Sequence, residues 1–137
     1  MNDDVKAVLQ DCTNASVEER ITFPEVVAAL AAVGVERYHT DLLRGETTYY
    51  LPGGGSERVP GKPPGKWMAG HPAAAFSAAG VADAVRAIQT GTIRYREFCE
   101  RVMQAGCVGW MTFLAGKRVV YYGRTGDSHV EWFPGAR

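Results

Sequence analysis

The chain has 137 residues, of which 46% are apolar, and its 15 basic and 15 acidic side chains cancel. This length and composition are typical of a single globular domain with a hydrophobic core, and the balanced charge argues against a nucleic acid partner. No apolar run is long enough to span a membrane, and the acidic start at residues 1–4 lacks the apolar stretch of a signal peptide. We therefore expect a cytoplasmic protein with neither a nucleic acid nor a membrane as a partner.

Two helices are predicted at the start of the chain, because apolar residues recur there with the spacing of one helical face. They are Val5, Val8, Leu9 and Cys12 in the first helix, and Phe23, Val26, Val27 and Leu30 in the second. Thr22 and Glu25 have the spacing of a capping box at the start of the second helix. Gly34 stands where a helix commonly ends in a left-handed residue.

After Gly34 the apolar period changes to two, which predicts strands over 37–42 and 46–51 joined by a turn. Residues 52–72 hold six glycines and five prolines and predict a long irregular connection.

The second half of the chain repeats the first at an offset of 72 residues. Residues 21–54 align with 93–126 without a gap and with eight identical pairs, among them Gly34 with Gly106 and Tyr49 with Tyr121. The repeat predicts two further helices, strands over 107–114 and 118–123, and a last strand near 128–133. We expect one α+β domain over residues 1–137, with pseudo-repeats 1–54 and 73–126 of an ααββ unit. The strands should form an antiparallel sheet with the helices packed on one face.

The three cysteines, Cys12, Cys99 and Cys107, are interpreted as core residues, because two of them align with valines in the other repeat. No cysteine or histidine spacing indicates a metal site, and we expect no cofactor. Glu25 and Glu97 occupy matching positions in the first turn of a helix, where a carboxylate caps exposed N–H groups. His39 lies on the polar side of its strand and is expected to be solvated.

The tyrosine pairs 49–50 and 121–122 lie in predicted strands, so one ring of each pair should face inward. We take Tyr49, Tyr121, Trp110 and His71 as candidate ligand-binding residues. Because no catalytic set is recognisable, we expect a non-catalytic protein that binds a protein or a small molecule. The alternative is an enzyme with a site on the sheet face under residues 52–72, using Tyr49, Tyr121, His71 and Cys99.

The strand around Trp110 is apolar on both faces, whereas its counterpart in the first repeat has a polar face. Met111 and Phe113 align with His39 and Asp41. Burying two such side chains is worth about 3–6 kcal/mol, so something should cover them. We consider a homodimer interface at Met111 and Phe113, or cover by Trp67 and Met68 of the 52–72 connection.

Several of these residues occur together in a known family of unknown function. They are Phe23-Pro24, Gly34-Val35, Tyr38, Tyr95, Phe98-Cys99, Ala105-Gly106, Trp110 and Tyr121-Tyr122. Over roughly residues 20–134 the chain resembles the small bacterial family of domain of unknown function 1398, some members of which are labelled phage envelope protein. The chain departs from it in a longer Gly/Pro-rich middle and in Gly123, where an acidic residue is expected. The resemblance implies a compact α+β domain and no catalytic residue.

Overall fold

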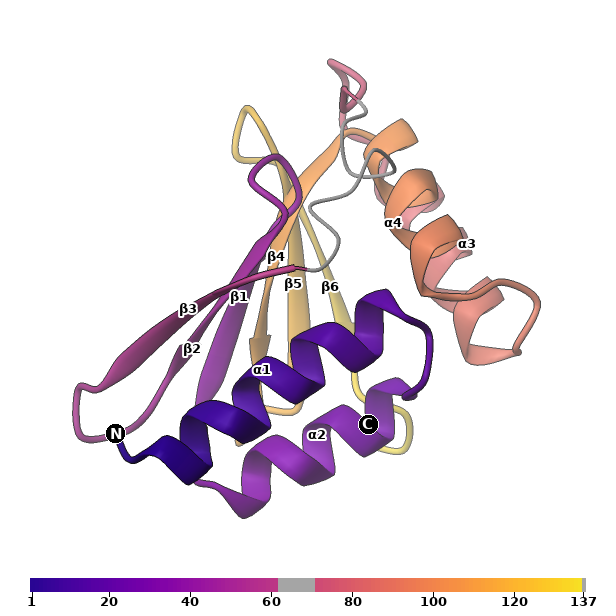
Figure 1. Cartoon of the computed structure of the whole chain (residues 1–137). Coiled ribbons are helices and arrows are strands. Elements are labelled where there is room, and N and C mark those ends of the chain that lie inside the picture. The colour runs from indigo at the N-terminus through magenta and orange to yellow at the C-terminus, as the bar shows by residue number, and fades with distance from the viewer. Residues whose placement is uncertain (62–70, 137) are drawn as a thin grey trace.

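The computed structural model describes residues 1–61 and 71–136. The chain has an α+β fold in which two pairs of helices accompany a single sheet (Figure 1). The helices are α1 (Asp3–Val17), α2 (Phe23–Ala32), α3 (Ala78–Gln89) and α4 (Tyr95–Gln104). The strands are β1 (Arg37–Asp41), β2 (Glu46–Tyr50), β3 (Ser56–Pro60), β4 (Cys107–Phe113), β5 (Arg118–Gly123) and β6 (Ser128–Trp132). No helix within the described ranges has both the length and the apolar character needed to cross a membrane.

The strands form one antiparallel sheet in the order β3-β2-β1-β4-β5-β6. Neighbouring side chains of a strand point to opposite faces, and here one face is buried while the other stays partly exposed. The buried face carries Tyr38, Thr40, Thr47, Tyr49, Val59, Trp110, Thr112, Val119 and Tyr121. Residues of all four helices pack on this face, which confirms the predicted antiparallel sheet with helices on one side.

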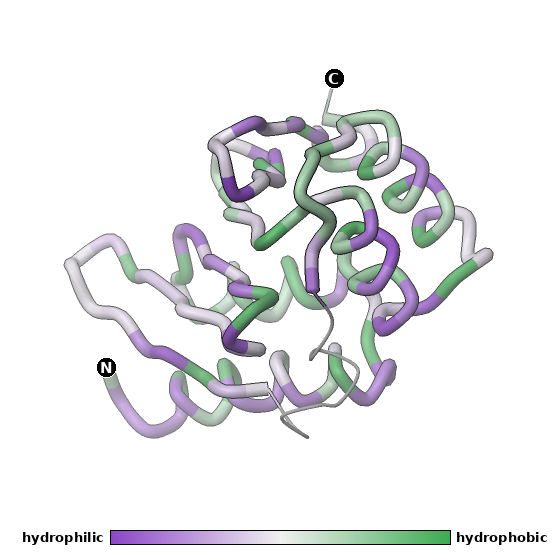
Figure 2. Tube along the Cα trace, turned by 90° about the horizontal axis from the view of Figure 1, so that it is seen from above, coloured by the Kyte–Doolittle hydropathy of each residue, from purple (hydrophilic) through white to green (hydrophobic). Residues whose placement is uncertain are grey.

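The core has two parts, one beneath each helix pair. Helices α1 and α2 contribute Leu9 and Leu30 to the first part, and helices α3 and α4 contribute Val81 and Val102 to the second. All four side chains are fully buried. Hydrophobic and hydrophilic residues alternate along the helices in Figure 2, as expected when one helical face packs and the other meets solvent.

The two halves of the chain have the same succession of two helices and three strands. Adding 72 to the bounds of α2 and β3 gives the bounds of α4 and β6. At the centre of the sheet, His39 of β1 lies opposite Met111 of β4, which is its own counterpart 72 residues later. Each half also places one leucine in the core of the other half, Leu42 in the second part and Leu114 in the first. This pattern of pairing is what an internal duplication with a local twofold axis predicts.

The predicted irregular connection over 52–72 is wrong in its first part, because residues Ser56–Pro60 form strand β3. This strand lies at the edge of the sheet, where a proline is tolerated because one side of the strand needs no hydrogen-bond donor. Glycines precede it and Pro60 ends it, so its composition indicates a loop. Its place is set by pairing with β2. The rest of that connection, with Trp67 and Met68, lies outside the described residues.

The predicted helix ends are largely confirmed. The Glu25 carboxylate accepts hydrogen bonds from the Thr22 backbone N–H at 2.9 Å and from the Thr22 hydroxyl at 2.8 Å. Gly34 and Gly106 have φ angles of +85° and +87°, in the left-handed region. Glu97 does not cap its helix as predicted. It accepts two hydrogen bonds from Arg101 instead, at 3.0 and 2.7 Å.

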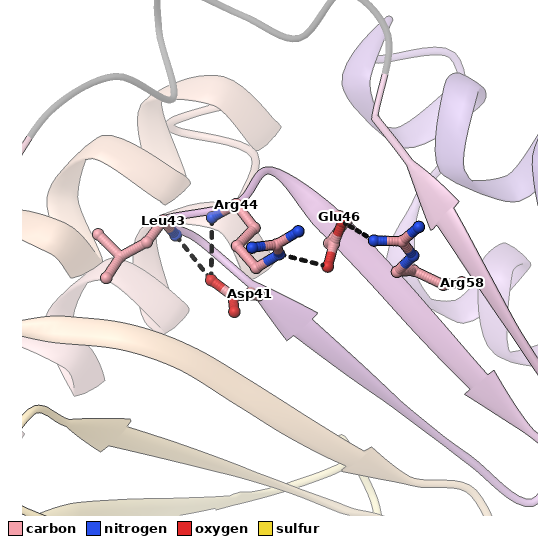
Figure 3. A network of polar contacts seen from close by, with 5 residues as sticks. All are labelled: Asp41, Leu43, Arg44, Glu46 and Arg58. Carbon is pink, nitrogen blue, oxygen red and sulfur yellow. Dashed lines mark hydrogen bonds and ion pairs between the residues drawn. The ribbon is translucent and has the colours of Figure 1, made fainter.

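A polar network holds the turn between β1 and β2 (Figure 3). The Asp41 carboxylate accepts from the backbone N–H groups of Leu43 and Arg44, at 2.9 and 3.0 Å. Glu46 receives the side chain of Arg44 at 2.8 Å and that of Arg58, from β3, at 3.5 Å. The network thus fixes the hairpin and ties β3 to it.

Candidate functional site

A cavity of about 730 Å³ lies on the helix-covered face of the sheet, with all four helices contributing to its walls. Its floor comes from β1, β2, β4 and β5. Most of the first-half residues that line it have their counterpart 72 residues later in the lining as well, including Tyr49 with Tyr121 and Tyr38 with Trp110. The cavity therefore straddles the centre of the sheet, where the two halves of the chain meet.

Aromatic side chains dominate the inner surface of this cavity. The ring centroids of Phe98 and Trp110 are 5.7 Å apart, and those of Trp110 and Tyr121 are 5.6 Å apart. On the first-half side the rings of Tyr38 and Tyr49 are 5.5 Å apart. Rings at these separations pack edge-on or tilted and form a rigid apolar wall. The wall suits a ligand with an apolar body.

Four tyrosine hydroxyls, those of Tyr38, Tyr49, Tyr95 and Tyr121, belong to the lining. Burial raises the pKa of Tyr38 to about 12, and it raises the pKa values of the other three still further. All four hydroxyls are therefore neutral near pH 7 and act as hydrogen-bonding groups rather than as charges.

Three carboxylates and one guanidinium also line the cavity. Glu19 is paired with Arg94, whose Nε lies 3.8 Å from a carboxylate oxygen. Glu46 is held by the two arginines of the turn network (Figure 3). Glu131 of β6 lies with its Oε2 atom 2.5 Å from Nε2 of His129, and both side chains are about three-quarters buried, with exposed fractions of 23% and 24%.

Three of the four residues predicted to bind a ligand line the cavity: Tyr49, Tyr121 and Trp110. His71 does not line it and is exposed to solvent. The sequence interpretation missed Glu131, which had no counterpart among the polar residues of the first repeat. It also missed Tyr38 and Tyr95, although the repeat aligns Tyr38 with Trp110 and therefore marked that position.

The cysteines are buried, as predicted. Burial raises the pKa of the Cys99 thiol strongly and that of Cys107 to about 11. Both thiols are therefore protonated near pH 7, and a protonated thiol is a poor nucleophile. This chemistry gives no support to the enzyme alternative in which Cys99 attacks a substrate.

The opposite face of the sheet carries Met111 and Phe113, both partly exposed. His39 lies on this face as predicted, but it is not simply solvated: its Nε2 atom is 2.6 Å from the Tyr122 hydroxyl, and the two rings stack. Arginines also lie over rings there, Arg118 over Trp132 at 4.2 Å among them. This face is thus covered in part by its own side chains.

Comparisons with known proteins add a family but no activity. A search of curated proteins finds no match to the chain. Residues 73–130 match the model of the family described as "Protein of unknown function (DUF1398)". The matched segment includes α3, α4, β4 and β5, and it is narrower than the range over which the sequence suggested a resemblance. Over its second half, the chain is therefore similar to this family of unknown function.

Proposed function

We propose that the protein is a binding protein whose central cavity holds a small molecule with an apolar body. The observation that carries this proposal is the cavity itself. Its volume of about 730 Å³ lies within the roughly 300–1,000 Å³ of small-molecule sites. Its wall of rings and its few polar groups match the composition of such sites, in which apolar contacts supply affinity and isolated polar groups orient the ligand.

We further propose that the binding unit is one domain built from two pseudo-repeats, residues 1–54 and 73–126, which enclose the ligand between them. The equal succession of elements and the pairing of His39 with Met111 support this view. A cavity at the junction of two repeats draws half of its lining from each, so that small differences between the repeats make its two ends unlike.

The proposal can be tested with Nile red, an uncharged dye whose emission increases in apolar surroundings. Ile88 of α3 lines the cavity, so Ile88→Trp should fill part of it and weaken dye binding about tenfold or more. Asp83→Trp adds the same side chain at an exposed position of the same helix, outside the lining, and should leave binding unchanged.

Saturable binding that is lost only in Ile88→Trp supports the cavity as the site. Equal binding by both variants would place the dye on another surface, such as the exposed face of the sheet. Thermal melts of both variants must show one cooperative transition, because a misfolded variant exposes apolar surface that also binds the dye.

A further inference from the structure

The two ends of the cavity differ in hydrogen bonding, although Tyr49 and Tyr121 are counterparts in the repeat. The Tyr49 hydroxyl is 2.7 Å from the hydroxyl of Thr13 in α1, so its hydrogen-bonding capacity is used within the protein. The counterpart of Thr13 in α3 is Val85, which has no polar side-chain atom. Among the described residues the Tyr121 hydroxyl makes no hydrogen bond, although its residue is only 7% exposed. A buried hydroxyl in this state gains free energy from any partner that enters the cavity.

Glu131 adds a negative charge to the same end. Tyr121 pairs with His129 across the strands, so Glu131 is its diagonal neighbour on the buried face of the sheet. The pKa of Tyr121 is raised mainly by burial and further by the charge of Glu131, so this hydroxyl stays protonated. The contact with His129 uses Oε2 of Glu131, and Oε1 makes no hydrogen bond to the described residues.

The other carboxylates of the lining are already balanced. Glu19 and Glu46 are each paired with arginine, which carries a permanent charge. Glu131 is the one lining carboxylate, among the described residues, without an arginine or lysine partner. A carboxylate only accepts hydrogen bonds, so it favours a ligand group that donates them.

The rings beside Tyr121 reinforce this preference. Trp110 and Phe98 lie with their ring centroids 5.6 and 6.2 Å from that of Tyr121. The face of an aromatic ring attracts a positive charge, most strongly in tryptophan, and more so where water is excluded. An anion would meet both Glu131 and the negative ring faces and would be repelled.

We infer that the cavity binds an organic amine, with its ammonium group at Tyr121 and Glu131 and its apolar body along the ring wall. The ammonium donates to Oε1 of Glu131 and to the Tyr121 hydroxyl, while the body lies toward the first-half rings Tyr38 and Tyr49. This inference rests on the proposed ligand-binding function and narrows it to one chemical class.

The test uses three probes that share a naphthalene ring and differ in charge: 1-naphthylmethylamine, 1-naphthalenemethanol and 1-naphthoic acid. Their affinities are measured by isothermal titration calorimetry on the full chain at pH 7. We expect the amine to bind about tenfold more tightly than the alcohol, since a hydrogen bond to a charged group is stronger than a neutral one. The acid should bind most weakly.

Two variants locate the ammonium group. Glu131→Gln should weaken the amine about tenfold and leave the alcohol unchanged, and Tyr121→Phe should weaken the amine by a smaller factor. The matched control is Glu57→Gln, a carboxylate on the other edge strand that does not line the cavity. It should change none of the three affinities. Unchanged alcohol binding also shows that each variant is folded.

The outcomes separate the inference from the proposal on which it rests. If the alcohol or the acid binds as tightly as the amine, or if Glu131→Gln leaves the amine affinity unchanged, the amine class is wrong while the cavity remains a binding site. If none of the three probes binds and Nile red does not bind either, the proposed function fails and the inference fails with it.

Discussion

Replacing Gly34 or Gly106 with alanine should destabilise the protein by clearly different amounts, although the two glycines are counterparts and have φ angles of +85° and +87°. A residue with a side chain in the left-handed region costs about 1–2 kcal/mol. At Gly34 the added Cβ would meet only Cδ2 of Leu51 at 3.8 Å, which is an ordinary contact. Gly34→Ala should therefore lower the free energy of unfolding by about 1–2 kcal/mol, from the backbone alone.

At Gly106 the same Cβ would lie 2.3 Å from the carbonyl oxygen of Ala75 and 2.8 Å from Cα of Phe76. These are backbone atoms, and the hydrogen bond from Ser77 N–H to the Ala105 carbonyl, at 2.7 Å, holds that segment in place. Overpacking adds about 1–3 kcal/mol to the backbone cost, so Gly106→Ala should lose about 2–5 kcal/mol.

Urea unfolding followed by circular dichroism at 222 nm measures both losses. Gly53→Ala is the control, because its Cβ would meet nothing within 4 Å and its φ is not positive, so its stability should stay the same or rise slightly. Equal losses at Gly34 and Gly106 would mean that residues 75–76 do not pack against Gly106 in solution. No loss at Gly34 would refute the left-handed helix end.

Three further outcomes follow from burial. Cys99→Val should keep the melting temperature within a few degrees, and native Cys99 should react slowly with a thiol reagent at pH 7; a fast selective reaction would contradict its burial. Stability should fall between pH 10 and 12, because Tyr38 has a pKa of about 12 when folded and about 10 when unfolded, so the unfolded chain loses its proton first; this accounts for up to about 3 kcal/mol in urea titrations, and Tyr38→Phe should remove that part of the slope. If the exposed sheet face is a homodimer interface, wild type should sediment as a dimer and Phe113→Asp should raise the dissociation constant. A monomeric wild type would exclude the dimer, and an unchanged constant would place the interface elsewhere.

The amino-acid sequence predicted the helices and most of the strands because their signals are local. The hydrogen bonds from Thr22 to Glu25 and the positive φ of Gly34 involve residues within one turn of a helix end. The alternation of β1 and β5 reflects burial on one face of a sheet, and it also predicted that Tyr49 and Tyr121 point inward. Strand β3 escaped prediction, because a short edge strand between glycines and a proline is stabilised by its partner β2 rather than by its own composition.

The candidate site depended on tertiary structure to a much greater extent. Its cavity is bounded by elements from α1 to β6, so no segment of the sequence carries its outline. Tyr49 and Tyr121 are equivalent in the repeat, and only the position of α1 and α3 over the sheet shows that Thr13 satisfies one hydroxyl while Val85 leaves the other unsatisfied. Glu131 acquires its role in the same way. Local propensity determines which face of a strand a side chain occupies, but its hydrogen-bond partners come from distant parts of the chain, and packing alone brings those parts together.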